Sequence, residues 1–142
     1  MSADAYGNFR GKRLVIFGCG YVGSAVAWRA VARGGRVNAP TRNAAKAEAL
    51  RREGIEVVVG DLAADAWHGQ IEGGADFVLN CVSSGGAGID GYRRSYVEGM
   101  GSILEWAMRR GAAGTFVYTS STSVYPQCDG AEFDEDASTC CE

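Results

Sequence analysis

The stretch RLVIFGCGYVG, residues 13–23, decides the fold of this chain. It contains a continuous apolar run of the kind that makes a strand buried on both faces. Three glycines follow with the spacing Gly18-x-Gly20-x-x-Gly23, where this strand would end and a helix would begin. There Gly18 permits a tight turn, Gly20 lets the backbone approach a pyrophosphate, and Gly23 lets helix and strand pack closely. The stretch predicts a dinucleotide-binding loop, with a plain glycine turn as the alternative.

The helix that follows strengthens this prediction. Its N-terminus offers unsatisfied N–H groups and a favourable dipole to an anion. Tyr21 and Val22 lie at this N-terminus and complete the predicted cofactor-binding loop. The helix is expected over residues 21–33, with Val22, Val26 and Ala30 on its apolar side.

Outward from this stretch, short apolar runs alternate with helix-like segments, which is typical of βαβ units and a parallel sheet. Further strands are expected at 36–40, 55–61, 75–82 and 114–120, and further helices at 44–54, capped by Asn43, and at 92–110. The last helix carries an apolar stripe of Tyr96, Val97, Met100, Ile103, Leu104, Ala107 and Met108. Right-handed crossovers then favour a doubly wound α/β sheet of the Rossmann type, about five strands in the order 3-2-1-4-5, with ligands beyond the carboxyl ends of the strands.

Composition limits the functions to consider. The 142 residues suffice for one buried core, and we expect an N-terminal extension at 1–12, a dinucleotide-binding domain at 13–125 and an acidic, mobile segment at 126–142. A net charge of −3 argues against nucleic acid. The absence of a signal peptide or a membrane-length apolar run indicates a cytoplasmic protein without membrane contact.

Several side chains of types that often serve in active sites are expected to have structural or solvent-exposed roles here. The five cysteines read as reduced thiols, and Cys128, Cys140 and Cys141 lack the spacing of a metal site, so no metal is expected. His68 is expected in a surface segment without a catalytic role. We also expect three tryptophans to pack helices onto the sheet and four arginines to lie on solvated helix faces: Trp28, Trp67, Trp106, Arg93, Arg94, Arg109 and Arg110.

The end of the second strand indicates which dinucleotide binds. An NAD site usually places an acid there for the ribose hydroxyls. Here the stretch NAPTRNAAK has no acid and presents Thr41 and Arg42 instead. Because the planar guanidinium suits a phosphate, we expect Arg42 to bind the 2′-phosphate of NADP, with NAD as the alternative cofactor. An exposed arginine near a helix start is the competing interpretation.

The ends of the third and fourth strands supply the remaining candidates. Asp61 is placed to reach the adenine, with Leu62 packing against the ring, although Asp61 could instead cap the following turn. After the fourth strand, Cys81, Val82 and Ser83 lie where the cofactor ribose or phosphate would pass, and a simple glycine-serine loop is the alternative.

Taken together, the motifs VIFGCGYVGSAVA, TRNAAKAEAL, GIEVVVGDL, YVEGMGSILEWAMRRG and FVYTSSTSVYP resemble the short-chain dehydrogenase/reductases, in their extended or atypical branch of epimerase/dehydratase type. The resemblance runs from about residue 12 to residue 136 and implies hydride transfer with a nicotinamide cofactor. It implies a substrate that is a sugar nucleotide or another carbonyl compound. By register with SSTSVY, it also assigns the substrate-binding hydroxyl to Ser121, with Thr122 and Ser123 as fallbacks.

Two parts of the family's machinery are not found. The resemblance implies a Tyr-x-x-x-Lys pair, but the sole lysines, Lys12 and Lys46, both precede the serine turn. The chain thus resembles the N-terminal part of the fold, truncated before the substrate-binding region. We expect a domain that is catalytically incomplete alone, completed by a C-terminal chain or present as a homodimer. The alternatives are a non-catalytic sensor or partner subunit, and an enzyme like the UDP-sugar dehydrogenases, whose opening GCGYVGSAVA resembles.

Overall fold

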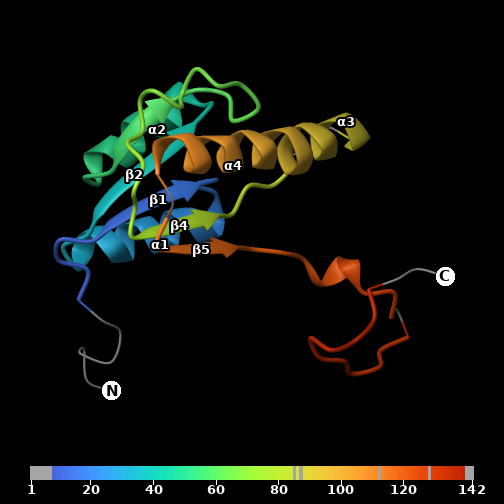
Figure 1. The fold of residues 1–142 in the computed structure, drawn as a ribbon. Helices are drawn as coiled ribbons and strands as arrows, with labels where there is room; N and C mark the ends of the chain where they lie inside the picture. Colours follow the sequence, from blue (N-terminus) through green and yellow to red (C-terminus); the bar gives the residue numbers. More distant parts are fainter. Residues whose placement is uncertain (1–7, 85, 87, 112, 128, 140–142) are drawn as a thin grey trace.

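A computed structural model describes residues 8–139 except 85, 87, 112 and 128 (Figure 1). Parts of the two expected terminal segments, and with them Cys128, Cys140 and Cys141, lie outside the described residues. The elements run in the order β1 (Arg13–Phe17), α1 (Tyr21–Ala32), β2 (Arg36–Thr41), α2 (Ala44–Arg52), β3 (Glu56–Val59), β4 (Phe77–Asn80), α3 (Gly88–Tyr92), the π-helical turn η2 (Arg93–Glu98), α4 (Gly99–Arg110), β5 (Thr115–Tyr118) and the 3-10 turn η3 (Thr122–Val124).

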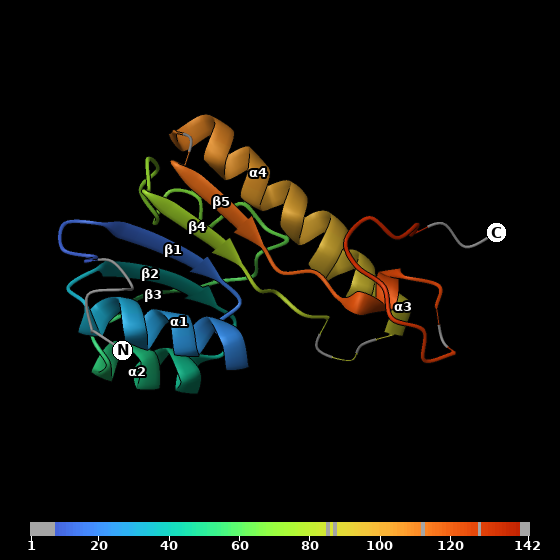
Figure 2. The same ribbon diagram turned by 90° about the horizontal axis from the view of Figure 1, so that it is seen from below.

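The five strands form one parallel sheet in the order β3-β2-β1-β4-β5, which confirms the predicted Rossmann topology. β1 lies at the centre, with Leu14 paired to Val37 of β2 and to Phe77 of β4. α1 and α2 cover one face of the sheet, and the long helix formed by α3, η2 and α4 crosses the other face (Figure 2). The carboxyl ends of the strands therefore point toward one edge, between the two helical layers.

Side chains of β1 alternate between two cores, as expected for a strand buried on both faces. Leu14 and Ile16 pack with residues of α1 and α2. Val15 and Phe17 pack on the opposite face with α4 and with the irregular segment between β3 and β4. That segment forms no helix, yet it supplies the buried side chains Trp67 and Ile71.

The expected apolar stripe of the long helix does not coincide with the side of the helix that is buried. Of its members Ile103 is buried, whereas Val97 is 66% and Met108 86% exposed. The buried side is instead made by Ile103, Trp106 and the small residues Gly99 and Ser102. Two causes are visible: the π-helical turn shifts the residues that share a face, and small residues let the helix approach closely, which a count of large apolar residues misses.

Small residues also form the buried side of α1. Val22 is 49% exposed, and the buried side consists of Gly23, Ser24, Ala27 and Ala30. Small side chains bring this helix close to the sheet. The expectation that Val22 belongs to the buried face was therefore wrong, while Ala30 lies where it was predicted.

Two aromatic residues also differ from expectation. Trp67 and Trp106 are buried, but Trp28 is 50% exposed on the outer side of α1. His68 is buried rather than on the surface, and its Nε2 lies 2.8 Å from the hydroxyl of Ser102. Since that hydroxyl donates to the carbonyl oxygen of Ala64 at 3.0 Å, Nε2–H of His68 is the donor to Ser102.

Neither a membrane span nor a metal cluster is found in the part of the chain that the structure describes. None of the helices there is long and apolar enough to cross a bilayer. Among the same residues, no three His, Cys, Asp or Glu side chains gather closely enough to hold a metal ion.

Candidate functional site

The glycine loop forms a tight connection from β1 to α1. Gly18 has a φ of +86°, and a Cβ there would lie 2.6 Å from the backbone of Cys81 and Val82. A Cβ on Gly23 would overlap the carbonyl oxygen of Gly18, so these two glycines let the backbone segments touch. Gly20 differs, because a Cβ there would meet nothing within 4 Å. The loop is therefore close-packed at two glycines and open to a ligand at the third.

A cavity of about 200 Å³, here called the first cavity, opens at the carboxyl ends of β1 to β4. It brings together eight of the predicted cofactor-binding residues from four separate stretches of sequence: Gly18, Gly20, Arg42, Asp61, Leu62, Cys81, Val82 and Ser83. The cavity is also lined by residues that sequence reasoning did not select: Cys19, Pro40, Lys46, Ala63, Arg94 and Ser95.

Four predicted residues do not line this cavity. Gly23 is buried against the loop itself, and Tyr21 is 96% exposed at the start of α1. Val22 is half exposed beside it. The hydroxyl of Thr41 accepts a hydrogen bond from the backbone N–H of Asn43 at 3.3 Å, which fixes the turn before α2.

Positive charge gathers where β2 leads into α2. Asn43 caps this helix as expected, its side-chain oxygen accepting from the N–H of Lys46 at 2.9 Å. The first turn of α2 contains no acid. Arg42 and Lys46 both line the first cavity, and neither forms an ion pair with another described residue. The helix dipole adds to their charge, so this wall of the cavity favours an anion.

Both carboxylate oxygens of Asp61 accept hydrogen bonds. Its Oδ1 accepts from the N–H of Ala63 at 3.0 Å, and its Oδ2 accepts from Nη2 of Arg94 at 2.6 Å. The hydrogen bond from Arg94 is the main cause that lowers the pKa of the Asp61 carboxyl, so this group stays ionised. The side chain of Arg94 is 53% exposed, as expected for a solvated helix face, but it also lines the cavity and binds Asp61, which the sequence did not predict. Sequence spacing could not show this, since Asp61 and Arg94 are 33 residues apart.

Cys19, in the middle of the glycine loop, is a buried thiol. Burial raises its pKa to about 11, while the nearby charge of Lys46 acts in the opposite direction. The thiol is therefore neutral at physiological pH. Its place in the loop is that of a small buried side chain.

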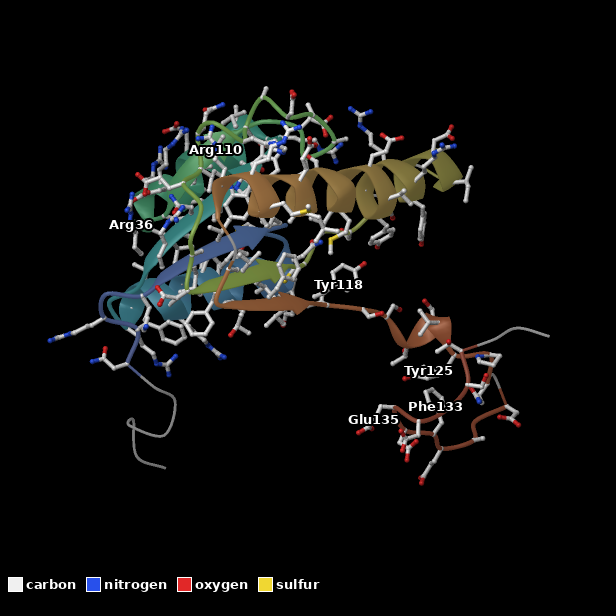
Figure 3. The ribbon with its side chains drawn as sticks, in the orientation of Figure 1. Arg36, Arg110, Tyr118, Tyr125, Phe133 and Glu135 are labelled. Atoms are coloured by element: carbon white, nitrogen blue, oxygen red, sulfur yellow. The ribbon has the colours of Figure 1, made fainter. Side chains whose placement is uncertain are left out.

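A second cavity, of about 470 Å³, adjoins the first and shares Cys81, Val82 and Ser83 with it. Its remaining lining residues come from the long helix and from the end of β5: Tyr92, Tyr96, Tyr118, Thr119, Ser120, Ser121, Ser123 and Val124. Figure 3 shows Tyr118 at the end of β5, extending into the space beneath the long helix. Three tyrosines thus face this cavity, none of them selected from the sequence.

Ser121 lines the second cavity and also caps η3. Its hydroxyl oxygen accepts from the N–H of Ser123 at 3.2 Å and lies 2.9 Å from the hydroxyl of Ser123. The fallback Ser123 lines the cavity too, whereas Thr122 does not. Beyond this point the chain runs away from the sheet, with Tyr125 and Phe133 in ring contact at 4.7 Å (Figure 3).

The arrangement of glycine loop, open strand ends and two adjoining cavities has a counterpart among known proteins. The NAD dependent epimerase/dehydratase family matches residues 14–140. The chain belongs to this epimerase/dehydratase family. The predicted resemblance is thereby confirmed, and the fold is that of a nicotinamide dinucleotide-binding domain.

Solved structures support the assignment of this epimerase/dehydratase chain. A short-chain dehydrogenase/reductase superfamily protein from Agrobacterium tumefaciens with bound NAD is 26% identical, with a TM-score of 0.72 over 92% of the chain. A UDP-galactose 4-epimerase (24% identical, TM-score 0.68 over 82%) and an NAD⁺-bound xylitol dehydrogenase (21%, 0.65 over 82%) support the fold alone. The chain spans 39%, 41% and 55% of the length of these three structures. No curated protein matches it.

Proposed function

We propose that this chain is the cofactor-binding part of an oxidoreductase or epimerase of the short-chain dehydrogenase type, and that it prefers NADP to NAD. The observation that carries the preference is the pair of cations Arg42 and Lys46, which face the first cavity without ion-pair partners among the described residues. They lie beside the N-terminus of α2, whose first turn has no acid.

The chemistry of this wall suits a phosphate monoester better than a diol. The ribose hydroxyls of NAD are best bound by a carboxylate, and none follows β2 here. A 2′-phosphate carries a charge of about −1.5 to −2 and accepts charge-assisted hydrogen bonds from a guanidinium, an ammonium group and free helix N–H groups. Such bonds contribute about 1.5–3 kcal/mol each when sheltered from water, and less at an open site.

Replacing Arg42 with alanine should weaken NADPH binding about tenfold or more and change NADH binding less than twofold, because only NADPH carries the 2′-phosphate. The measurement is calorimetric titration of both cofactors. Arg52→Ala is the matched control, since Arg52 lies on α2 but outside the first cavity. Equal weakening of both cofactors by Arg42→Ala would contradict the proposed preference.

For the chemical step, we propose Ser121 as the hydroxyl that binds the substrate oxygen in the second cavity, where a sugar nucleotide or other carbonyl compound would lie. The sequence has no Tyr-x-x-x-Lys, so it lacks the general acid/base that the family uses with this hydroxyl. We therefore propose that the 142-residue chain binds the cofactor but does not transfer hydride alone, and that a complementing C-terminal chain completes the site; a homodimer of this chain is the alternative assembly. Its proposed location is the cytoplasm.

The purified chain should oxidise NADPH no faster in the presence of sugar nucleotides or simple carbonyl compounds than in their absence. Absorbance at the nicotinamide band gives the rate. Turnover that Ser121→Ala abolishes would show a complete active site and refute this proposal. The absent Tyr-x-x-x-Lys also favours a second candidate, a non-catalytic dinucleotide sensor, which would bind NADPH equally well but gain no activity from any partner chain.

A further inference from the structure

The first cavity contains one carboxylate among four charged side chains. Arg42, Lys46 and Arg94 supply positive charge, and Asp61 is the single acid among the described residues that line it. The three cations come from three elements: the turn after β2, the first turn of α2, and η2 on the opposite helical layer. The cation that forms an ion pair with Asp61 is no longer available to a ligand, and the other two remain available.

In this structure Arg94 forms the ion pair with the Asp61 carboxylate. Nη2 of Arg94 lies 2.6 Å from Oδ2 of Asp61, and Ala63 holds the other carboxylate oxygen from the strand side. Arg42 lines the same cavity as Asp61, and its charge also lowers the pKa of that carboxyl, as the smallest of the contributing causes. Arg42 is therefore the alternative ion-pair partner of Asp61. The proposed NADP preference depends on this same residue.

The local backbone explains how Arg94 reaches the cavity. Arg94 and Ser95 lie on η2, and they line the first cavity while Tyr92 and Tyr96 line the second. A π-helical turn inserts one extra residue into a helix and so re-aims the side chains that it carries. Gly99 follows the turn, where a Cβ would lie 3.3 Å from the carbonyl oxygen of Arg94, which keeps this part of the helix close-packed.

We propose that Arg94 is a specificity-determining positioning residue: by binding Asp61 at one side of the first cavity, it leaves Arg42 and Lys46 unpaired for the 2′-phosphate. This inference rests on the proposed NADP preference. Without Arg94 the Asp61 carboxylate is drawn toward Arg42, the charge available to the phosphate falls, and the ribose end of the cavity acquires the carboxylate that suits NAD. Arg94 therefore acts through Asp61 and needs no contact of its own with the 2′-phosphate.

The ratio of NADPH to NADH affinity isolates this effect, because every contact shared by the two cofactors cancels in it. We would titrate the purified 142-residue chain with both cofactors as wild type, Arg94→Gln, Asp61→Asn and the double variant, with circular dichroism to verify folding. Arg93→Gln is the matched control: Arg93 is on the same turn, its side chain is 77% exposed, and it pairs with Glu98 outside both cavities. Arg94→Lys tests partial rescue.

The expected result is a preference of the wild type for NADPH that falls about fivefold or more in Arg94→Gln and persists in Arg93→Gln. In the double variant it should return to within about twofold of the wild type, since the freed carboxylate is gone. Arg94→Lys should lie between these values, because lysine keeps the charge but lacks the guanidinium fork.

Two outcomes would overturn the inference while leaving the proposed function standing. One is an unchanged ratio in Arg94→Gln. The other is a ratio that falls in Arg94→Gln and stays low in the double variant, which would mean that Arg94 binds the phosphate directly. A wild type without any NADPH preference would instead refute the proposed preference itself, and the inference with it.

Discussion

Gly18→Ala should abolish dinucleotide binding and lower the free energy of unfolding by about 2–5 kcal/mol. Gly18 has a φ of +86°, where an L-residue with a Cβ is strained. The new Cβ would also lie 2.6 Å from the backbone of Cys81 and Val82, which cannot move without shifting β4. Denaturant unfolding followed by circular dichroism measures the loss of stability.

Gly20→Ala is the matched control within the same loop. Its Cβ would meet nothing within 4 Å and its φ is negative at −76°, but its ψ of −146° lies outside the α and β regions that suit a residue with a Cβ. The loss of stability should therefore be smaller than for Gly18→Ala, at about 1–2 kcal/mol from backbone strain alone. The Cβ also enters the space where a pyrophosphate would approach, and it should weaken dinucleotide binding about tenfold or more. If both variants lost the same stability, the separation of one structural and one ligand-facing glycine would be wrong.

Trp106→Ala should cost about 3–5 kcal/mol of unfolding free energy. Trp106 is 1% exposed and joins α4 to both the sheet and the irregular segment before β4. Its ring lies 5.6 Å from that of Phe17 and 5.9 Å from that of Trp67, and its Nε1–H donates to the carbonyl oxygen of Ile71 at 2.9 Å. Truncation would open a cavity and leave a buried carbonyl without its donor.

Trp28→Ala provides the comparison, because the same chemical change occurs at a side chain that is 50% exposed. It should cost about 1 kcal/mol or less, since solvent replaces most of the lost contact. The midpoints of urea unfolding, followed by circular dichroism, give both values. A loss at Trp28 as large as that at Trp106 would contradict the assignment of the core to the α4 face.

The fold could be predicted because its signals are local. The apolar run of β1, the glycine spacing after it and the cap at Asn43 each depend on residues within one turn or strand. Parallel strands with helical crossovers admit few arrangements, so the strand order followed from the element order. In a parallel sheet the carboxyl ends of the strands meet at one edge. Residues that follow different strands could therefore be predicted to share one site, and Gly18, Arg42, Asp61 and Cys81 do line one cavity.

Which faces of the helices are buried could not be predicted so well. The periodicity of α1 and α4 placed Val22 and Met108 in the core, but close approach through small residues and a π-helical turn exposed them. His68 seemed a surface residue because its partner, the Ser102 hydroxyl, is distant in sequence. Such choices depend on how two layers meet, and no single segment contains that information.

The sequence by itself thus determined the Rossmann sheet, the glycine loop and the absence of an acid after β2, because sterics, capping and periodicity act between near neighbours. Only the tertiary structure decided the electrostatics of the site. It brought Arg94 from the opposite layer to Asp61 and placed three tyrosines in the same cavity as Ser121. Charge pairing depends on distance in space, and packing sets that distance between residues far apart in the chain.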